Sequence, residues 1–346
     1  MTWIGKELTN PSFVLRKVKD VVIEDRPKPV LKEPHDFIVH VKQTGICGSD
    51  VHYWQRGRIG DYVLTGPMVL GHESSGEVVE VGSAVSHLKP GDRLAMEPGV
   101  PCRRCNQCRS GAYHLCGGMI FAATPPWDGT LAKYYVNAAD FCYKVPDHMS
   151  MKEAAMVEPV SVAVAIAKTA DLCAHQTVLV FGCGPIGVLC QVVAKAHGAK
   201  TVIGVDVPEP GADPIAHAEK MAQKLKEECG LGEGADVVLE CSGAEPCVQM
   251  GVFAARHGGT IVQAGMGKEV INFPIAAVCT RGLVVKGSIR YLTGCYPAAI
   301  DLIVKGINDV KRLVTNRFKF EEAEQAFELV KAGRQDVFKV MIAGVV

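Results

Sequence analysis

The pattern of apolar and polar positions changes character near the middle of the chain. Up to about residue 155, short apolar or alternating runs are separated by turns that contain Gly and Pro, which is typical of β-strands. Examples lie at 36–41, 76–81 and 92–96. The first part of the chain is therefore predicted to be rich in β-structure.

From about residue 175 the pattern alternates between strands and helices. Residues 177–181 form an apolar run, 186–197 show the apolar spacing of a helix, and 201–206 again resemble a strand. This order predicts a βαβ unit with parallel strands. Further strands are expected at 235–240, 260–264 and 284–288, and further helices at 214–229, 297–305 and 321–332, with one strand between the last two helices and another at the end of the chain.

Length and charge narrow the class of protein. A chain of 346 residues with 48% apolar and 21% charged residues has enough material for two globular domains. Lys plus Arg and Asp plus Glu number 37 each, so no excess charge favours nucleic acid or an anionic membrane as a partner. The first residues do not resemble a secretory signal, and no apolar run reaches the roughly 18 residues of a membrane span. We expect a cytoplasmic protein.

The fourteen cysteines include one dense cluster. In a reducing compartment, metal binding or burial explains cysteines better than disulfides do. Four of them follow the spacing C-x2-C-x2-C-x7-C: Cys102, Cys105, Cys108 and Cys116. Four thiolates can surround one tetrahedral Zn²⁺ and leave no open position, which predicts a structural zinc site. An iron–sulfur cluster and four unrelated core cysteines are the alternatives, while the neutral charge disfavours a zinc module that binds nucleic acid.

A second set of possible metal ligands is dispersed along the chain. Cys47 lies in a glycine-flanked segment, His72 and Glu73 follow Gly71, and Glu158 precedes a proline. A catalytic zinc takes three protein ligands of N, S or O type and keeps one position open. Taken singly, each residue also has an ordinary explanation as a core thiol, a turn histidine or a solvated carboxylate. Spacing alone leaves both interpretations open.

A glycine-rich turn follows the apolar run at 177–181. Gly182, Gly184 and Gly187 form G-x-G-x-x-G between a strand and a helix, the context that dinucleotide binding requires. The first two glycines allow a tight turn and close approach of a pyrophosphate, and the third lets helix and strand pack closely. Asp206 ends the next strand, where a carboxylate binds the adenosine ribose and repels a 2′-phosphate, so NAD is favoured over NADP. A plain structural turn is the alternative.

Together these motifs resemble the zinc-containing medium-chain dehydrogenases/reductases. The chain is most similar to the polyol (sorbitol/xylitol) dehydrogenase branch and, within it, to the fungal-type xylitol dehydrogenases, also called D-xylulose reductases. The resemblance extends from about Gly45 to the C-terminus. It rests on GICGSDVHYW at 45–54, GRIGDY at 57–62, PMVLGHESSGEVVEVG at 67–82, FAATPPWDG at 121–129, VEPVSV at 157–162 and IRY at 289–291.

The resemblance implies an α/β fold with two domains. A GroES-like, β-rich catalytic domain would comprise residues 1–157 and 290–346 and carry the zinc ions. A Rossmann domain with a doubly wound parallel sheet would comprise residues 158–289 and bind NAD. The family also implies a small-molecule polyol substrate and a homo-oligomer, either a dimer or a tetramer.

Site residues follow from the resemblance position by position. It implies that Cys47, His72 and Glu73 ligate the catalytic zinc, and that Glu158 binds it directly or through the metal-bound water. It also implies that Asp50 fixes the tautomer of His72. The remaining matches are Ser49 and His52 for proton transfer; Tyr53, Phe121, Thr124, Arg290 and Tyr291 for the polyol pocket; Gly182, Gly184, Pro185, Ile186, Gly187 and Asp206 for NAD; and Cys102, Cys105, Cys108 and Cys116 for the structural zinc.

The implied reaction is oxidation of a polyol secondary alcohol to a ketose, with xylitol and D-xylulose as the expected pair. Zinc lowers the pKa of the bound hydroxyl so that an alkoxide can form near neutral pH, and hydride then passes to NAD. Sorbitol dehydrogenase, L-arabinitol dehydrogenase and another zinc alcohol or threonine dehydrogenase are the alternatives.

One segment departs from the family pattern. Only 29 residues separate Asp206 from Asp236, and they contain a single predicted helix. A complete Rossmann half places helix, strand and helix here, which needs roughly 40 residues or more. Either the chain lacks a stretch that the full protein has, or this variant has lost a helix and an edge strand, which would weaken NAD binding.

Overall fold

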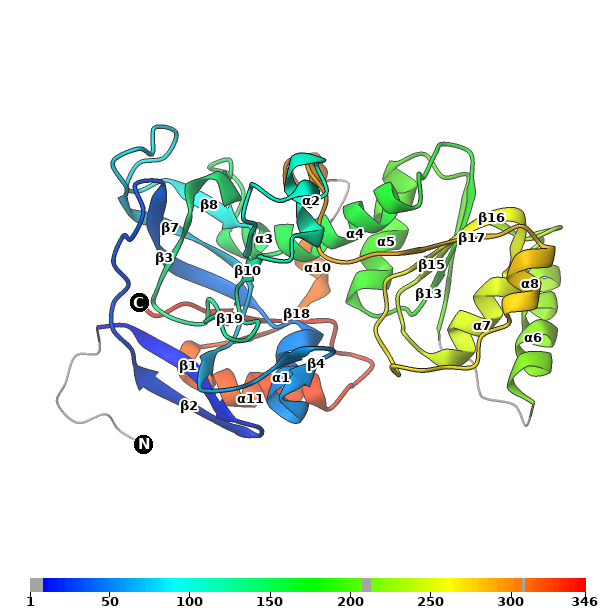
Figure 1. Cartoon of the computed structure of the whole chain (residues 1–346), viewed down its shortest axis with the longest axis horizontal. Helices are drawn as coiled ribbons and strands as arrows, with labels where there is room; N and C mark the ends of the chain where they lie inside the picture. Colours follow the sequence, from blue (N-terminus) through cyan, green and yellow to red (C-terminus); the bar gives the residue numbers. More distant parts are fainter. Residues whose placement is uncertain (1–8, 207–212, 307–308) are drawn as a thin grey trace. The chain divides into compact units, whose positions relative to one another are not determined.

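The computed structural model describes residues 9–206, 213–306 and 309–346 (Figure 1). By internal packing, the described parts of Met1–Glu158 and Asp309–Val346 form one compact unit, and those of Pro159–Asn308 form the other. We call them unit 1 and unit 2. The domain boundaries expected from the sequence, at 157/158 and 289/290, stay predictions.

Unit 1 is built on a mixed seven-stranded sheet with the order β12-β8-β7-β3-β19-β18, to which β11 adds by pairing with β3 (Figure 1). The strands are β3 Asp36–Gly45, β7 Glu73–Val81, β8 Arg93–Met96, β11 Tyr134–Ala138, β12 Cys142–Lys144, β18 Val314–Phe318 and β19 Lys339–Ala343. The β-rich character predicted for the first part of the chain is confirmed. Because β19 pairs with β3, the last strand of unit 1 is part of the same sheet as strands from the first part of the chain.

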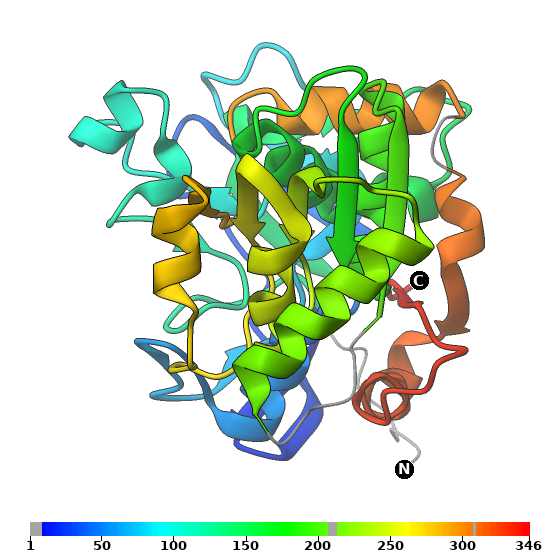
Figure 2. The same ribbon diagram turned by 90° about the vertical axis from the view of Figure 1, so that its right-hand side faces the viewer.

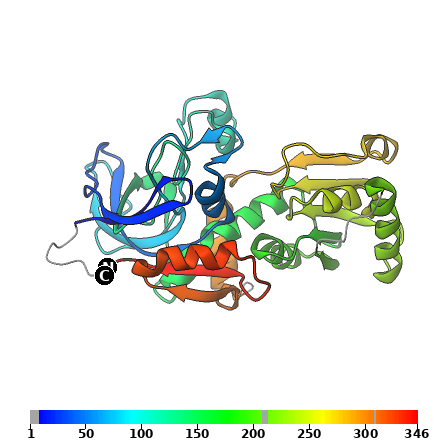
Figure 3. The same cartoon turned by 90° about the horizontal axis from the view of Figure 1, so that it is seen from below.

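Smaller elements complete unit 1. Strands β1 (Pro11–Lys17), β2 (Asp20–Asp25) and β6 (Met68–Val69) form a second sheet. Helix α11 (Ala323–Lys331) lies along β18 and β19, as Figure 3 shows, and buries Phe327 against Phe13 with ring centroids 5.2 Å apart. The second sheet and the C-terminal helix therefore share one apolar core.

Unit 2 is a five-stranded parallel sheet with the order β14-β13-β15-β16-β17. Its strands are β13 Thr177–Phe181, β14 Thr201–Val205, β15 Ala235–Glu240, β16 Ala255–Gln263 and β17 Val284–Gly287, and its helices include α5 Pro185–Ala196, α6 Pro214–Glu228, α7 Glu245–Ala254, α8 Ile275–Thr280 and α9 Cys295–Val304. The predicted βαβ unit and parallel strands are confirmed.

Helices cover both faces of this sheet. Leu179 and Phe181 pack into a core with Ala218 and Ala222 of α6, which lies across the sheet in Figure 2. Val180, whose side chain points to the opposite face, contacts the start of α5, where a Cβ on Gly187 would lie 3.6 Å from it. This is the two-sided covering expected of a doubly wound sheet.

The short segment after β14 is also visible in the fold. Between Asp206 and β15 the described residues contain α6 alone, so β14 is an edge strand within the described part of unit 2. The prediction of one helix in place of helix, strand and helix is confirmed for residues 213–235. Residues 207–212 lie outside the described part of the chain.

The sequence analysis did not predict several of the helices. Helix α4 (Val157–Thr169) is buried almost all round, so its sequence lacks the amphipathic period of a surface helix. Helix α1 (Gly48–Arg56) is short, and it begins directly after β3. No helix in the part of the chain that the structure describes is long and apolar enough to cross a membrane.

Candidate active site and structural zinc site

The pairing of β3 with β7 brings three dispersed residues together. Gly45 at the end of β3 lies opposite Glu73 at the start of β7, and Cys47 follows β3 as the residue that caps α1. One ligand atom from each of Cys47, His72 and Glu73 lies within 4.8 Å of the others. A Cβ on Gly45 would lie 2.3 Å from a carboxylate oxygen of Glu73, so a glycine is required here for the carboxylate to occupy this place.

The carboxylate of Asp50 contacts the backbone and the imidazole that carry these ligand atoms. Its carboxylate accepts hydrogen bonds from the backbone N–H of Gly71, at 2.9 Å, and of Cys47, at 3.2 Å. The same carboxylate lies 3.3 Å from His72 Nδ1, which leaves Nε2 to face the other ligand atoms. Asp50 is 1% exposed. One buried carboxylate thus fixes the backbone and the imidazole that present the ligands.

The acidic neighbours of His72 favour a positive charge among Cys47, His72 and Glu73. Burial lowers the pKa of His72, but the neighbouring Asp50 and Cys47 raise it by more, so the pKa lies well above its ordinary value. A thiolate, an imidazole and a carboxylate are ligands that Zn²⁺ binds in catalytic sites with one open position. Zinc therefore fits this donor set.

Lys339 is a buried neighbour of this group that the sequence analysis missed. It lies on β19, is 4% exposed, and donates hydrogen bonds to Glu73 Oε1, at 2.6 Å, and to the carbonyl of Ile46, at 3.1 Å. Burial lowers the pKa of Lys339, whereas Glu73 and Cys47 raise it, with a net rise. The only sequence signal is a single lysine at the start of the otherwise apolar strand Lys339–Ala343.

Glu158 lies outside the close group. It begins α4 and is 5% exposed, and its charge contributes to the raised pKa of Lys339. Its ligand atoms are not among those within 4.8 Å of one another. Direct or water-mediated binding of zinc by Glu158 stays a prediction.

Two residues expected in the polyol pocket, Tyr53 and Phe121, lie near His72, and a third, Thr124, is bonded to Tyr53. The ring of Phe121 lies 5.7 Å from the imidazole, centroid to centroid. Burial raises the pKa of Tyr53 to about 12, against a lowering by its hydrogen bond with Thr124. Tyr53 also interacts electrostatically with His72, so Tyr53 and Phe121 are neighbours of His72, and Thr124 is bonded to Tyr53.

The two residues expected to transfer protons differ in their surroundings. Ser49 Oγ lies 3.5 Å from His72 Nε2, at the edge of the metal group. His52 is half-buried on the next turn of α1, and burial together with Arg56 lowers its pKa. A neutral imidazole near physiological pH is suited to accept a proton.

Arg290 and Tyr291 belong to unit 2. Arg290 has φ +57°, in the left-handed region, and Tyr291 is 2% exposed and packs edge-on against Tyr296 at 5.2 Å. Their contribution to the polyol pocket stays a prediction.

The four-cysteine cluster forms a separate lobe with α2 (Asn106–Arg109). All four sulfurs lie within 4.8 Å of one another, with Cys105 at 3.4 Å from Cys108 and 3.8 Å from Cys116. Backbone hydrogen bonds from Arg104 and Cys105 lower the pKa of Cys102 to about 6, while burial and the neighbouring sulfurs raise that of Cys108 to about 12. Four such thiols can ionise together only around a cation, so the donor set fits a closed, structural zinc.

A buried carboxylate anchors this lobe to the sheet. Glu97, 1% exposed, accepts hydrogen bonds from the hydroxyls of Tyr113, at 2.5 Å, and Tyr143, at 3.0 Å. Tyr113 lies three residues before Cys116, and Tyr143 is on β12. Burial raises the pKa of Glu97 to about 7. The lobe is thus tied to the sheet at a titratable group.

In unit 2 the three glycines of the turn differ in how much space a side chain would have at each position. Gly182 has φ +86°, and a Cβ on it would lie 2.9 Å from the backbone N of Ser242. A Cβ on Gly187 would lie 1.8 Å from the carbonyl oxygen of Gly182, whereas one on Gly184 would meet nothing within 4 Å. Gly184 therefore faces open space at the N-terminus of α5, where a phosphate is stabilised by free N–H groups.

The other cofactor residues lie around the same turn. Pro185 and Ile186 form the first residues of α5, and Pro185 occupies a position where its missing N–H costs nothing. Asp206 follows β14 and is exposed, and burial and the charge of Asp206 raise the pKa of Cys183 in the turn. Asp206 and the turn are therefore neighbours.

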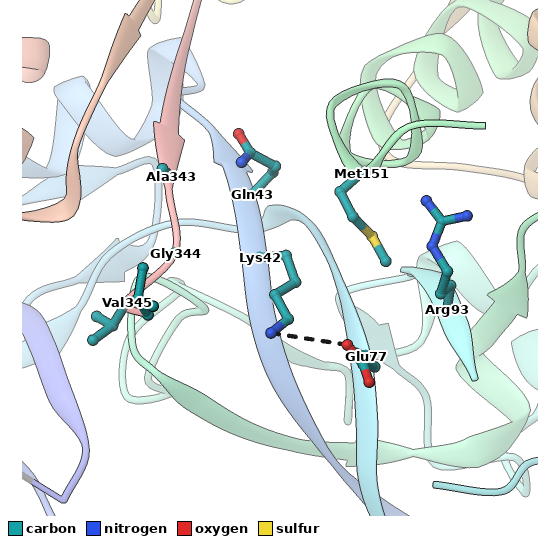
Figure 4. A pocket seen from close by; sticks show the side chains of 9 residues that line it. Lys42, Gln43, Glu77, Arg93, Met151, Ala343, Gly344 and Val345 are labelled. Carbon is teal, nitrogen blue, oxygen red and sulfur yellow. Dashed lines mark ion pairs between the residues drawn. The ribbon is translucent and has the colours of Figure 1, made fainter. Parts of the chain in front are cut away.

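A surface cavity of about 460 Å³ lies elsewhere in unit 1 (Figure 4). It is lined by Lys42, Gln43, Glu77, Arg93, Met151 and residues 343–346, and Lys42 pairs with Glu77 at 3.8 Å. None of these residues is predicted to bind zinc, substrate or cofactor.

Two family models match the chain: the alcohol dehydrogenase GroES-like domain at residues 33–147, and the zinc-binding dehydrogenase domain at residues 185–305. The chain is 54% identical to a D-xylulose reductase A from Aspergillus clavatus over 349 residues, which covers 97% of each protein. A relative of the same name from Arthroderma otae is 53% identical over 352 residues, covering 98% of each.

Solved structures have the same fold. The 2R,3R-butanediol dehydrogenase from Bacillus subtilis matches with a TM-score of 0.82 and 28% identity, covering 97% of this chain and 100% of that one. Galactitol-1-phosphate dehydrogenase from Escherichia coli matches with a TM-score of 0.85 and 25% identity, covering 96% and 99%.

Proposed function

The chain belongs to the zinc-containing alcohol dehydrogenase family, and from this premise we propose that it oxidises xylitol to D-xylulose with NAD as the hydride acceptor. In this reaction one carbon-bound hydrogen leaves as hydride to NAD⁺ and the hydroxyl proton leaves to solvent, giving NADH and a ketose. The observation that carries the proposal is the convergence of Cys47, His72 and Glu73 beside Tyr53, Thr124 and Phe121.

The protein's own groups prepare the substrate hydroxyl for this step. Cys47, His72 and Glu73 would hold the catalytic zinc, which acts as a Lewis acid when bound and lowers the pKa of the substrate hydroxyl. Ser49 Oγ lies within reach of His72 Nε2 and would take up the hydroxyl proton, and the neutral His52 would pass it to solvent. Asp50 keeps the imidazole of His72 oriented throughout.

Polar and aromatic side chains would orient the substrate. Tyr53 and Thr124 would hydrogen-bond polyol hydroxyls, and the ring of Phe121 would exclude water from the reacting carbon. Arg290 and Tyr291 would bind the hydroxyls farther from the reacting carbon. Several hydroxyl-binding groups favour a polyol over a simple alcohol, because an alcohol would leave them unpaired.

The cofactor would bind at the glycine turn of unit 2. Its pyrophosphate would lie over Gly184 at the start of α5, beside Pro185 and Ile186, with Gly182 and Gly187 shaping the backbone. Asp206 would bind the adenosine ribose and disfavour NADP. Cys102, Cys105, Cys108 and Cys116 would hold a second, structural zinc.

We also propose a cytoplasmic homo-oligomer, either a dimer or a tetramer. The edge strand β17 supports an interface between copies, because Val284 and Val285 are each 45% exposed and Ile275 on the adjoining α8 is 62% exposed. Light scattering after size exclusion measures the subunit number. A monomer at micromolar concentration would contradict the interface.

Sorbitol, L-arabinitol, threonine and simple alcohols are the competing substrates. A panel of these compounds and xylitol, each with NAD and with NADP, tests the proposal when zinc is quantified in the same preparation. We expect two zinc ions per chain and the highest kcat/KM for xylitol with NAD. A preparation with two zinc ions that oxidises ethanol or threonine but no polyol would contradict it.

A further inference from the structure

Glu240 is a buried carboxylate at the carboxyl end of β15. It is fully buried and accepts four hydrogen bonds within unit 2. Oε1 accepts from the backbone N–H of Ser242, at 2.9 Å, and from the Ser242 hydroxyl. Oε2 accepts from the backbone N–H of Gly243, at 2.9 Å, and from Gln263 Nε2, at 2.6 Å. A buried charge held by four neutral donors, rather than by a basic side chain, is a costly arrangement that stabilises one geometry.

These four hydrogen bonds fix the loop 241–243, which lies between the glycine turn that follows β13 and residues 265–267. A Cβ on Gly182 would lie 2.9 Å from the backbone N of Ser242, one on Gly265 would lie 2.1 Å from the backbone N of Gly243, and one on Gly267 would lie 1.8 Å from its carbonyl oxygen. The loop 241–243 is thus packed backbone to backbone against the glycine turn on one side and residues 265–267 on the other.

The backbone carbonyl of Glu240 accepts further hydrogen bonds that hold these loops together. The backbone N–H groups of Ala264 and Gly265 both donate to the Glu240 carbonyl at 2.8 Å, and Gln263 Nε2 also donates to the carbonyl of Gly265 at 2.8 Å. On the other side, the N–H of Cys241 donates to the carbonyl of Phe181, at the end of β13. Glu240 therefore joins the ends of β13, β15 and β16.

This junction lies where the strand order of the sheet reverses. From β13 the chain goes to β14 on one side and later to β15 on the other, and ligands of open parallel sheets bind at the carboxyl ends of such strands. We infer that Glu240 is a positioning residue for the dinucleotide: through Ser242 and Gly243 it fixes the backbone against which the Gly182 turn packs. The inference rests on the proposed binding of NAD at that turn.

The chemistry requires a carboxylate. Three of the four partners can only donate, and a glutamine at position 240 would offer one acceptor oxygen and turn an NH₂ group toward at least one of them. Glu240→Gln keeps the shape but loses at least one hydrogen bond and leaves a buried backbone N–H unpaired. The loop 241–243 would then move away from Gly182, and the turn would have to be ordered when the cofactor binds.

The test is fluorescence titration of the zinc-loaded protein with NADH. We expect Glu240→Gln to raise the Kd for NADH by about fivefold or more, since a buried N–H left without an acceptor corresponds to at least about that factor. Zinc content and the KM for xylitol at saturating NAD should stay within about twofold. An unchanged Kd in folded Glu240→Gln would overturn the inference.

Glu245→Gln is the matched control. Glu245 starts α7 and accepts hydrogen bonds from the N–H of Asn272, at 3.0 Å, and from Lys268, at 3.1 Å, and both donors lie outside the loop 241–243. The same chemical change at this position should leave the Kd for NADH within about twofold. An equal weakening by Glu245→Gln would overturn the inference, because the effect would then be general destabilisation.

Two more variants keep the test decisive. If Glu240→Gln does not fold, Gln263→Met removes only one donor and should raise the Kd by about threefold, and no rise would overturn the inference. Gly182→Ala tests the cofactor site itself. If it leaves NADH binding intact, both the site assignment and the inference fail; if it weakens binding while Glu240→Gln does not, only the inference fails.

Discussion

Cys47, His72 and Glu73 meet because β3 and β7 pair, and a lysine from the last strand of the chain completes their surroundings. The four cysteines of the lobe instead lie between residues 102 and 116 and need no distant partner. His72 and Glu73 are 6% and 1% exposed, whereas Cys102 is exposed. In the first group, strand pairing within the fold positions the metal ligands. In the second, the four ligands lie in one short segment, and the bound metal would itself hold much of that segment in place. The same ion should therefore contribute reactivity in one place and stability in the other.

The largest expected effect is on activity at the first group. Cys47→Ser removes a thiolate ligand, and polyol oxidation should fall by more than about a hundredfold while the protein stays folded. Activity and zinc content, at an expected one ion per chain, measure this. Cys142→Ser, a buried thiol on β12 outside both groups, is the control and should keep both ions. Full activity of Cys47→Ser would contradict the assignment.

Lys339→Met tests the buried ion pair with Glu73. Removing one partner of a buried pair leaves the other charge uncompensated, at a cost of about 3–5 kcal/mol. Zinc should offset part of that cost, so the free energy of unfolding should fall more in the presence of a chelator than with zinc. The surface variant Lys331→Met should change stability by less than about 1 kcal/mol. Equal losses with and without zinc would show that Lys339 does not act on the metal group.

Cys105→Ser tests the lobe. Loss of one of four thiolates should release the structural zinc and cost on the order of 2–3 kcal/mol, because the lobe has little apolar content to hold it ordered. Denaturant unfolding and zinc quantification check this. Activity below the unfolding transition should remain within a few-fold. A loss of activity as large as that of Cys47→Ser would remove the distinction between the two groups.

Glu97→Gln tests how pH acts on the lobe's anchor. The pKa of Glu97 is raised to about 7 in the folded protein, so protonation stabilises the fold below the ordinary value of 4.5, and that stability is lost as pH rises through 7. Relative to Glu97→Gln, the native protein should lose on the order of 2 kcal/mol between pH 5 and pH 8. Unfolding of both proteins at both pH values measures it. A constant difference would contradict the raised pKa.

Sequence reasoning succeeded where the chemistry is local. The four-cysteine cluster and the glycine turn each lie within one short segment, so spacing alone indicates which residues come together. The β-rich and parallel-sheet parts were also predictable, because their apolar periods differ. Family resemblance was needed to join Cys47 with His72 and Glu73, since each alone has an ordinary structural explanation.

What sequence reasoning missed depends on tertiary contacts. Lys339 is 266 residues from Glu73, and only the pairing of β19 with β3 brings them together. Glu240 ends an ordinary apolar strand, and its four donors become visible only when three loops meet. Helix α4 lacks a polar face because it is packed on nearly every side. In each case burial, rather than local preference, decided the outcome.

Anomalous diffraction at the zinc edge, from crystals of the zinc-loaded protein, separates the two groups most directly. We expect two peaks per chain: one about 2.3 Å from all four cysteine sulfurs of the lobe, and one at bonding distance from Cys47, His72 and Glu73 with a position left open. A single peak in the lobe, or ligand atoms of Cys47, His72 and Glu73 too far apart to share an ion, would contradict the dehydrogenase mechanism.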